Sequence, residues 1–202
     1  LDEADRHRYL GLMAQQVQRM QTLVSDLLTL SRLEGSPVPG VSEGFDAQLL
    51  LDEVVQEGRG LSEVLCTGGH QIEAQPGPGL RILGSRAEWH SAMSNLVGNA
   101  VRYTPAGGRI RAGWRRLDDG SAAFDVVDTG PGIAAEHLPR LTERFYRVDR
   151  SRSRDTGGTG LGLAIVKHVA QRHGGEVKVD SRLGKGSTFT LVVPASRIAQ
   201  AD

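Results

Sequence analysis

Residues 157–167 read GGTGLGLAIVK, and this stretch decides the fold. Its apolar residues recur at helical spacing, which predicts a glycine-rich loop leading into a helix from Gly160 to His173. Free backbone N–H groups at a helix N-terminus attract phosphate, and glycine leaves them unobstructed. No predicted strand directly precedes the glycines and no Gly-Lys-Ser/Thr sequence follows, which argues against the dinucleotide-binding and P-loop patterns. Alone, a glycine cluster is a weak indication of a phosphate site.

A second candidate site lies on the helix predicted from Arg86 to Tyr103. Asn95 and Asn99 are four residues apart, so their amides share one face of that helix. Amide oxygens can ligate Mg²⁺ without neutralising its charge, which leaves the ion free to bind phosphates. Taken alone, such a pair is more often solvent-facing or capping, although asparagine is a poor helix-interior residue.

The segment DTGPGI at residues 128–133 follows a predicted apolar strand. An aspartate at a strand end can accept a hydrogen bond from the amino group of adenine, and glycines let the backbone approach a flat ring. A strand-ending turn with a helix cap explains the segment equally well. Residues 184–191, GKGSTFTL, are by themselves an ordinary glycine turn into a strand.

Residues 143–149, ERFYRVD, precede three arginines at positions 150, 152 and 154. A charge run of this kind is usually a solvated surface segment. The alternative is a lid whose arginines meet phosphates, with Gly157 and Gly158 as hinges. If this alternative holds, residues 140–159 should be poorly ordered until a nucleotide binds.

The N-terminal part of the chain predicts one long helix from Arg6 to Leu33. Its apolar residues alternate at spacings of three and four, which is a heptad seam. The seam consists of Leu10, Met13, Val17, Met20, Val24 and Leu27. Leu23, Leu28 and Leu30 widen this stripe, which suits a four-helix bundle. A lone helix of this length is marginal in water, so it needs a partner to pack against.

The rest of the chain alternates helices and strands. The breaker cluster GSPVPG at residues 35–40 predicts a linker and a domain boundary. A helix expected within residues 45–65 is weakened by Gly58 and Gly60. Strands are expected at Gln71–Ala74, Leu80–Leu83, Ile110–Trp114, Ala122–Asp128, Val177–Asp180 and Ser187–Val193. The pattern predicts an α/β sandwich whose antiparallel or mixed sheet is backed by helices.

Composition narrows the function classes. The 202 residues carry 24 Lys+Arg and 24 Asp+Glu, so there is no basic excess of the kind that nucleic-acid binders show. No apolar run approaches the roughly 18 residues that would suggest a membrane span. Cys66 is the only cysteine, which excludes an internal disulfide and fits a reducing, cytoplasmic setting. The acidic start at Leu1, without Met or signal-peptide features, suggests a fragment.

In combination, these segments resemble the histidine-kinase branch of the GHKL ATPases, which bind ATP in a Bergerat fold. The asparagine helix resembles the N box, DTGPGI the first glycine box and ERFYRVD the F box. GGTGLGLAIVKH resembles the second glycine box and GKGSTFTL the third. The helix ending in LVSDLLTLSRLE is similar to the second helix of the family's dimerisation domain. Within the family, the nucleotide segments look particularly like those of the phosphate-regulon sensor kinases.

The resemblance covers nearly the whole chain and implies an α+β fold. A Bergerat ATP-binding α/β sandwich would be preceded by a long amphipathic dimerisation helix. Residues 1–34 would be the second helix of a partial dimerisation domain, residues 35–44 a linker and residues 45–197 the ATP-binding catalytic domain.

The resemblance also implies roles for individual residues. Asn99, with Asn95, would hold Mg²⁺, and Asp128 would bind adenine. Arg147 would meet the terminal phosphate as the catalytic residue of this chain. The implied ATP-binding set is Asn95, Asn99, Arg102, Tyr103, Asp128, Gly130, Gly132, Ile133, Phe145, Arg147, Gly158, Thr159, Gly160, Leu161, Gly162 and Thr188.

The implied ligands are ATP and Mg²⁺, and the implied partners are a second copy of the chain and a PhoB-like response regulator. No direct contact with nucleic acid is expected. The full-length protein is expected to lie at the cytoplasmic face of the inner membrane, which it would contact only through segments outside this sequence. One feature departs from the family pattern. None of the six histidines is followed by an acidic residue and Arg-Thr-Pro, so the phosphorylated histidine and the adjoining phosphatase motif are missing here.

Two other functions are compatible with parts of the pattern. An ATP-hydrolysing clamp, like the topoisomerase and chaperone relatives, needs an activating carboxylate near the N box. Glu88 lies seven residues before Asn95, about two helical turns away, and is badly placed. A non-enzymatic dimerisation module would not need paired asparagines and three glycine boxes.

Overall fold

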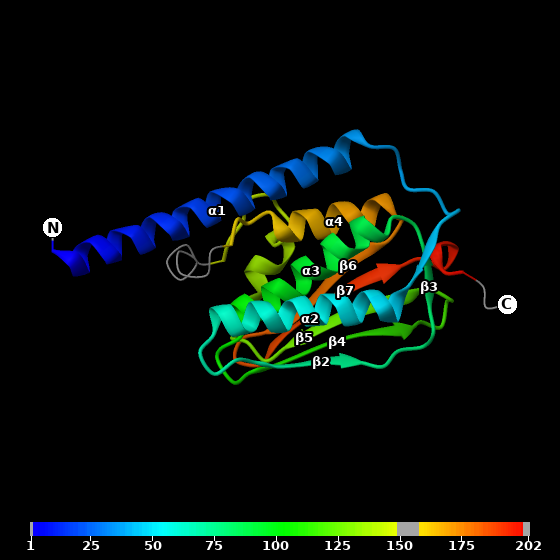
Figure 1. Cartoon of the computed structure of the whole chain (residues 1–202). Coiled ribbons are helices and arrows are strands. Elements are labelled where there is room, and N and C mark those ends of the chain that lie inside the picture. The colour runs from blue at the N-terminus through cyan, green and yellow to red at the C-terminus, as the bar shows by residue number, and fades with distance from the viewer. Residues whose placement is uncertain (1, 149–157, 200–202) are drawn as a thin grey trace.

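The two central strands form a hairpin around the turn Asp118-Asp119-Gly120. β4 (Arg109–Arg116) and β5 (Ala122–Asp128) pair antiparallel, and the Leu117 N–H donates to the Ser121 carbonyl at 2.8 Å across the turn. The structure is a computed structural model that describes residues 2–148 and 158–199 (Figure 1).

The main sheet has five strands in the order β2-β4-β5-β7-β6. β2 (Gln71–Gln75) runs parallel to β4, whereas β7 (Gly186–Val193) pairs antiparallel with both β5 and β6 (Glu176–Arg182). The sheet is therefore mixed, which confirms one of the two predicted forms.

One predicted strand belongs to a different sheet. β3 (Arg81–Leu83) pairs antiparallel with β1 (Gly44–Asp46), which the sequence did not predict. β1 is only three residues long, too short for the alternation of buried and exposed positions that reveals a strand in a sequence.

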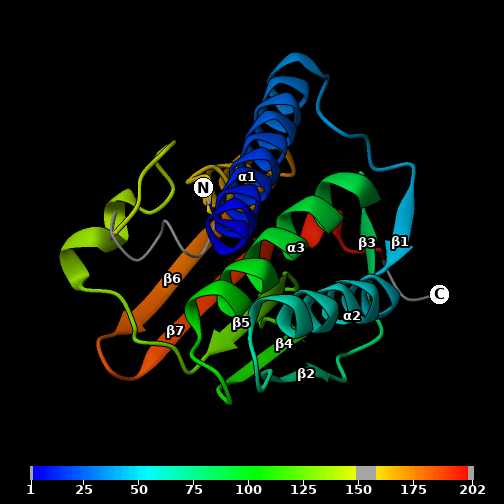
Figure 2. The same cartoon turned by 60° about the vertical axis from the view of Figure 1, so that its left-hand side comes forward.

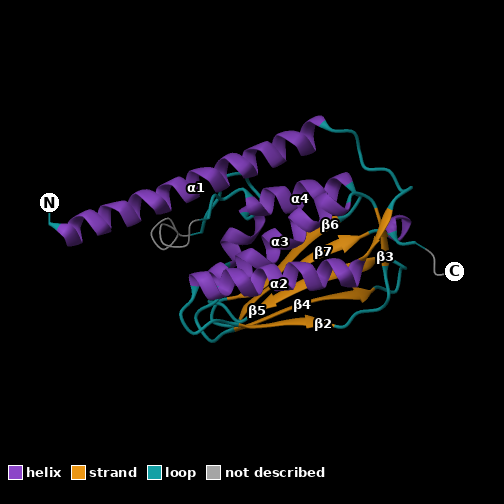
Figure 3. Ribbon diagram, viewed as in Figure 1, coloured by secondary structure: helices purple, strands orange, loops and turns teal. Residues whose placement is uncertain are grey.

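Three helices cover one face of the main sheet (Figures 2 and 3): α2 (Ala47–Leu65), α3 (Arg86–Tyr103) and α4 (Gly162–Arg172). Trp89, Phe124 and Leu191 are fully buried between the two layers. Gly58 does not interrupt α2. A Cβ at this position would lie 2.6 Å from Cγ1 of Val97, so glycine permits the close packing of α2 on α3.

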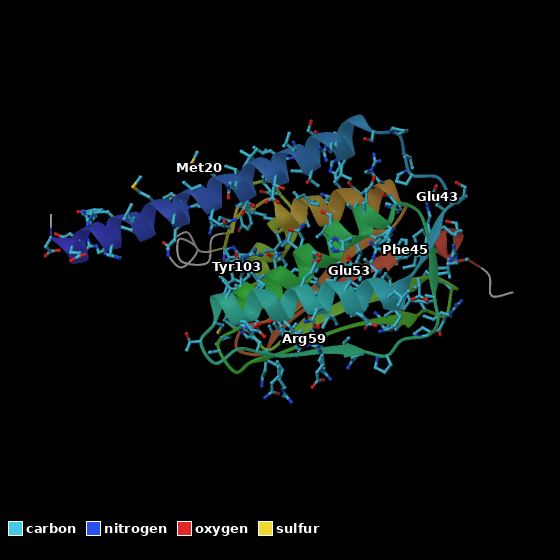
Figure 4. All side chains as sticks on the ribbon, in the orientation of Figure 1. Met20, Glu43, Phe45, Glu53, Arg59 and Tyr103 are labelled. Atoms are coloured by element: carbon cyan, nitrogen blue, oxygen red, sulfur yellow. The ribbon has the colours of Figure 1, made fainter. Side chains whose placement is uncertain are left out.

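The long helix α1 (Glu3–Gly35) packs against α4 through its C-terminal turns, where Leu30 and Leu33 are buried. All six seam residues are exposed, and Figure 4 shows Met20 pointing away from the rest of the molecule. This chain therefore does not bury its own seam. No helix in the described ranges is both long enough and apolar enough to span a bilayer.

The linker between α1 and β1 is held to the sandwich by two arginines. The Arg172 guanidinium donates to the carbonyls of Ser36 at 2.9 Å and Pro37 at 2.7 Å. Arg197, in the short helix η3 (Ala195–Arg197), donates to the Gly40 carbonyl at 2.7 Å. The linker has no regular secondary structure, yet it is fixed in place by these contacts.

Candidate functional site

A cavity of about 720 Å³ opens at the end of the sandwich where α3 meets the N-terminus of α4. Its volume falls within the usual range of ligand pockets. The structure brings most of the predicted site residues to its wall: Asn95, Asn99, Arg102, Tyr103, Asp128, Gly132, Ile133, Arg147, Gly158, Thr159, Gly160 and Gly162.

The asparagine pair of α3 meets the glycine loop directly. The Asn95 side-chain N–H donates to the Ser91 carbonyl at 2.8 Å, which orients the amide. Its oxygen faces the glycine loop. A Cβ on Gly162 would lie 2.5 Å from that oxygen, so only glycine fits beside it. An amide oxygen at the cavity wall suits a hard cation such as Mg²⁺.

Asp128 ends β5 inside the cavity and is buried. Burial raises the pKa of its carboxyl above the ordinary value, whereas hydrogen bonds from the backbone N–H groups of Gly130 and Ser187 oppose that rise. The Gly130 N–H lies 2.8 Å from Oδ1. The carboxyl is therefore oriented by backbone donors at the edge of the sheet.

The loop after Asp128 is fixed to the β6–β7 turn. The Ile133 N–H donates to the Ser181 hydroxyl at 2.8 Å, and the Gly184 N–H donates to the Pro131 carbonyl at 2.7 Å. These bonds connect the first and third glycine segments on one side of the cavity.

The opposite side of the cavity suits an anion. α4 begins after Leu161, and no side chain of the described residues caps its first backbone N–H groups. Gly160 and Gly162 line the cavity at this helix end. The Phe145 N–H donates to the Gly160 carbonyl at 2.9 Å, which fixes the glycine loop to the F-box segment.

Arg147 brings a guanidinium to the same end of the cavity. Burial lowers the pKa of Arg147, and interaction with Tyr103 opposes that change. The neighbouring Tyr146 is held by His137, whose Nδ1 lies 2.7 Å from the Tyr146 hydroxyl, and by Arg140, which stacks 4.3 Å from the ring centroid. The segment next to Arg147 is thus anchored to η1 (Ala135–Arg140).

The predicted lid is described only in part. Residues 140–148 and 158–159 have the contacts given above, whereas Arg150, Arg152, Arg154 and Gly157 lie outside the described residues. The expected disorder of this segment without nucleotide therefore stays a prediction.

Four predicted ATP-binding residues do not line the cavity: Gly130, Phe145, Leu161 and Thr188. The Gly130 N–H donates to the Asp128 carboxylate, and Leu161 is fully buried. Phe145 is 59% exposed and lies in a separate hollow with Arg144. The position of Thr188 follows from strand alternation. Its neighbours Ser187 and Phe189 point into the cavity, so Thr188 faces the other side of the sheet.

Sequence reasoning missed the contribution of α1. Thr22 and Asp26 line the cavity, and the Thr159 hydroxyl donates to Oδ2 of Asp26 at 2.5 Å. No sequence signal indicates this contact, because Asp26 lies seven residues after Arg19 on the polar face of the predicted helix, where a carboxylate is ordinary.

The histidines lie elsewhere. All six belong to the described part of the chain and none lines the cavity. His173 is buried beside Trp89, and His70 bridges Ser62 and Thr104. Glu88 is also outside the cavity, because both of its carboxylate oxygens accept from Arg172 at 3.0 and 3.1 Å.

Comparison with known proteins places these observations in a family. Residues 84–197 match the family model described as histidine kinase-, DNA gyrase B- and HSP90-like ATPase. The chain is 47% identical over 195 residues to the phosphate regulon sensor protein PhoR of Pseudomonas aeruginosa, covering 96% of this chain and 43% of that protein. It is 39% identical over 188 residues to the sensor-like histidine kinase SenX3 of Mycolicibacterium smegmatis, covering 93% and 48%.

A solved structure agrees with the fold. Full-length ShkA in complex with AMPPNP superposes with a TM-score of 0.76 at 30% identity, covering 98% of this chain and 40% of that one. The predicted fold class, a helix-backed sheet of the GHKL type preceded by a long helix, is thereby confirmed. The chain spans less than half the length of PhoR and SenX3.

Proposed function

Because this chain belongs to the family of histidine kinase-, DNA gyrase B- and HSP90-like ATPases, we propose that it is the catalytic and ATP-binding region of a two-component sensor histidine kinase. The observation that carries the proposal is the single cavity that the asparagine pair, Asp128 and the start of α4 all line. Relatives that are named as sensor kinases support it over nearly the whole chain.

In this proposal each wall of the cavity binds one part of Mg²⁺·ATP. Asp128, at the sheet edge, accepts a hydrogen bond from the adenine amino group. Asn95 and Asn99 hold Mg²⁺, which neutralises phosphate charge. The N–H groups at the start of α4 bind phosphate oxygens, and Arg147 approaches the terminal phosphate.

The reaction is phosphoryl transfer to histidine. A ring nitrogen of an acceptor histidine attacks the γ-phosphorus, the bond from that phosphorus to the β–γ bridging oxygen breaks, and ADP leaves with the bond's electron pair. Positioning and charge neutralisation supply most of the catalysis for this class of reaction. No histidine of this chain lines the cavity, so we assign the acceptor to a segment outside this sequence.

The whole protein would then form a homodimer through α1 and pass the phosphoryl group to an aspartate of a response regulator. The likeness to PhoR suggests a phosphate-regulon pathway, a PhoB-like regulator and a position at the cytoplasmic face of the membrane. We retain the proposed division into residues 1–34, 35–44 and 45–197.

An ATP-hydrolysing clamp is the rival function, and the position of Glu88 disfavours it. A clamp needs a carboxylate that can activate water at the terminal phosphate. Glu88 is instead held by Arg172 in the first turn of α3, about two helical turns from Asn95.

The experiment that tests the proposal supplies the acceptor separately. The chain is incubated with γ-labelled ATP and Mg²⁺, alone and with a dimerisation fragment that carries the family's histidine motif. We expect acid-labile label on the fragment only, and weakly, because separate pieces lose the effective concentration of a tethered substrate. The fragment with its histidine changed to alanine is the control. Label on the isolated chain, or none on any competent fragment despite confirmed ATP binding, would refute the proposal.

A further inference from the structure

The docking of α1 brings a carboxylate into the nucleotide cavity. Leu30 and Leu33 are buried against the sandwich, and the Arg172 guanidinium donates to the Leu33 carbonyl at 2.6 Å. Glu34 pairs with Arg144 at the same end of α1. These contacts fix the last turns of α1 beside α4, two turns beyond Asp26 (Figures 1 and 2).

Asp26 meets the cavity where phosphates would bind. Its Oδ2 accepts from the Thr159 hydroxyl at 2.5 Å, and Thr159 lies in the glycine loop three residues before α4 begins at Gly162. Desolvation raises the pKa of Asp26, whereas the Thr159 hydrogen bond and the charge of Arg102 oppose that rise. The carboxylate is therefore attracted by the same groups that suit a phosphate.

We propose that Asp26 of α1 competes with the phosphates of the nucleotide, so that docking of α1 and binding of ATP weaken each other. This inference rests on the proposed function. A bound phosphate and the Asp26 carboxylate are both anions directed at Thr159 and Arg102, and together at the cavity wall they repel. The coupling acts equally in both directions, so nucleotide must also loosen α1.

α1 also carries a positive charge toward this end of the cavity, because Arg19 lies close enough to influence Arg147. Asp26 is nevertheless the α1 side chain with a hydrogen bond to the glycine loop. The competition should therefore weaken the binding of ligands that carry phosphates and leave the binding of adenosine unchanged. Adenosine thus serves as the internal reference of the experiment.

The test compares Asp26→Asn with the unmodified chain in calorimetric titrations with AMPPNP·Mg²⁺ and with adenosine. Asparagine keeps the shape and removes the charge. We expect AMPPNP to bind at least fivefold more tightly to Asp26→Asn, with adenosine affinity unchanged. Asp52→Asn is the matched control, because Asp52 is an exposed carboxylate on α2 that contacts Gln48 and does not line the cavity. This control should leave both affinities unchanged.

Hydrogen exchange gives a second measurement on the unmodified chain. Adding AMPPNP should accelerate exchange of amides in residues 22–34, whereas adenosine should not. Equal AMPPNP affinity in Asp26→Asn, or slower exchange of α1 with AMPPNP, would overturn the competition. Weaker AMPPNP binding in Asp26→Asn would also overturn it and make Asp26 a contributor to the site. If the unmodified chain fails to bind AMPPNP at all, the proposed function itself is wrong.

Discussion

At the scale of single residues, the position of Asp128 on its strand decides whether its carboxyl can contact a ligand. The same strand carries Asp125 on its opposite face, where it pairs with Arg115 at 2.5 Å and accepts from the Thr190 hydroxyl at 2.5 Å. The two aspartates are three positions apart, yet only Asp128 lines the cavity. Strand alternation thus separates a binding carboxylate from a structural one.

We predict that Asp128→Asn weakens the preference for ATP over GTP at least tenfold. A carboxylate accepts from the adenine amino group and repels the carbonyl that guanine presents there, whereas an amide can donate to that carbonyl. Competition titrations with both nucleotides measure the ratio. Asp125→Asn is the matched control and should keep the preference. Equal binding of ATP and GTP by the unmodified chain would contradict the assignment.

We predict that Asn99→Ala removes the magnesium-dependent part of ATP affinity without unfolding the protein. Asn99 lies on the cavity wall one helical turn after Asn95, so its loss removes one amide oxygen from the proposed cation site. Calorimetry with AMPPNP in the presence of Mg²⁺ and of EDTA measures the difference. Gln71→Ala, on an exposed position of β2, is the control. An unchanged magnesium effect in Asn99→Ala would show that the ion is held elsewhere.

At the scale of elements, α1 has one face that packs against this chain and one apolar face that is exposed. Leu30 and Leu33 pack on the sandwich, whereas the seam from Leu10 to Leu27 is 44–65% exposed. An unpartnered apolar stripe of this length is expected to bind another helix. The first face is therefore covered by the sandwich of this chain, and the second can contact a partner helix.

We predict that the chain dimerises through the seam and that Val17→Glu raises the dimer dissociation constant at least tenfold. Burying a valine contributes about 1.5–3 kcal/mol, and the substitution occurs in both copies. Sedimentation equilibrium measures the constant. Gln18→Glu adds the same charge one residue away on the polar face and should leave the dimer intact. ATP binding should be retained in both variants. A monomeric unmodified chain at all accessible concentrations would contradict the prediction.

At the scale of the whole molecule, His173 connects the C-terminal end of α4 to the N-terminal end of α3. Its Nδ1 lies 2.8 Å from the Val169 carbonyl, and the Ser85 N–H donates to Nε2 at 3.3 Å, which requires the neutral ring. Burial lowers the pKa of His173 below its ordinary value, with smaller opposing contributions from Val169 and Glu88. Between the folded and unfolded pKa values, the unfolded chain therefore binds more protons than the folded one.

We predict that the free energy of unfolding falls as the pH drops below about 6.5, the unfolded pKa of histidine, by up to about 1.4 kcal/mol per pH unit. The raised pKa values of Asp26 and Asp128 act in the opposite direction, because those groups take up protons more readily when folded. Urea unfolding of the unmodified chain and of His173→Gln from pH 7.5 to 5.5 isolates the histidine. The variant should show the shallower slope. His7→Gln, exposed on α1, should keep the original slope, and equal slopes for all three proteins would refute the role of burial.

The sequence by itself predicted most of the helices and strands and twelve of the residues that line the cavity. Long periodic segments such as α1 and α3 were predicted within a few residues, because burial on one face imposes a period that a sequence displays. The asparagine pair was predicted to share one face because its spacing along a single helix fixes that face, and the structure places it at one cavity with the glycine loop and Asp128.

Only the tertiary structure decided what depends on contacts between distant segments. The pairing of β1 with β3, the side of β7 that faces the cavity and the arrival of Asp26 beside Thr159 could not be predicted. Asp26 and Thr159 are 133 positions apart, and no local period relates them. Their contact exists because Leu30 and Leu33 are buried where α1 packs on α4. This packing depends on residues that are far apart in the sequence, so only the tertiary structure determines it.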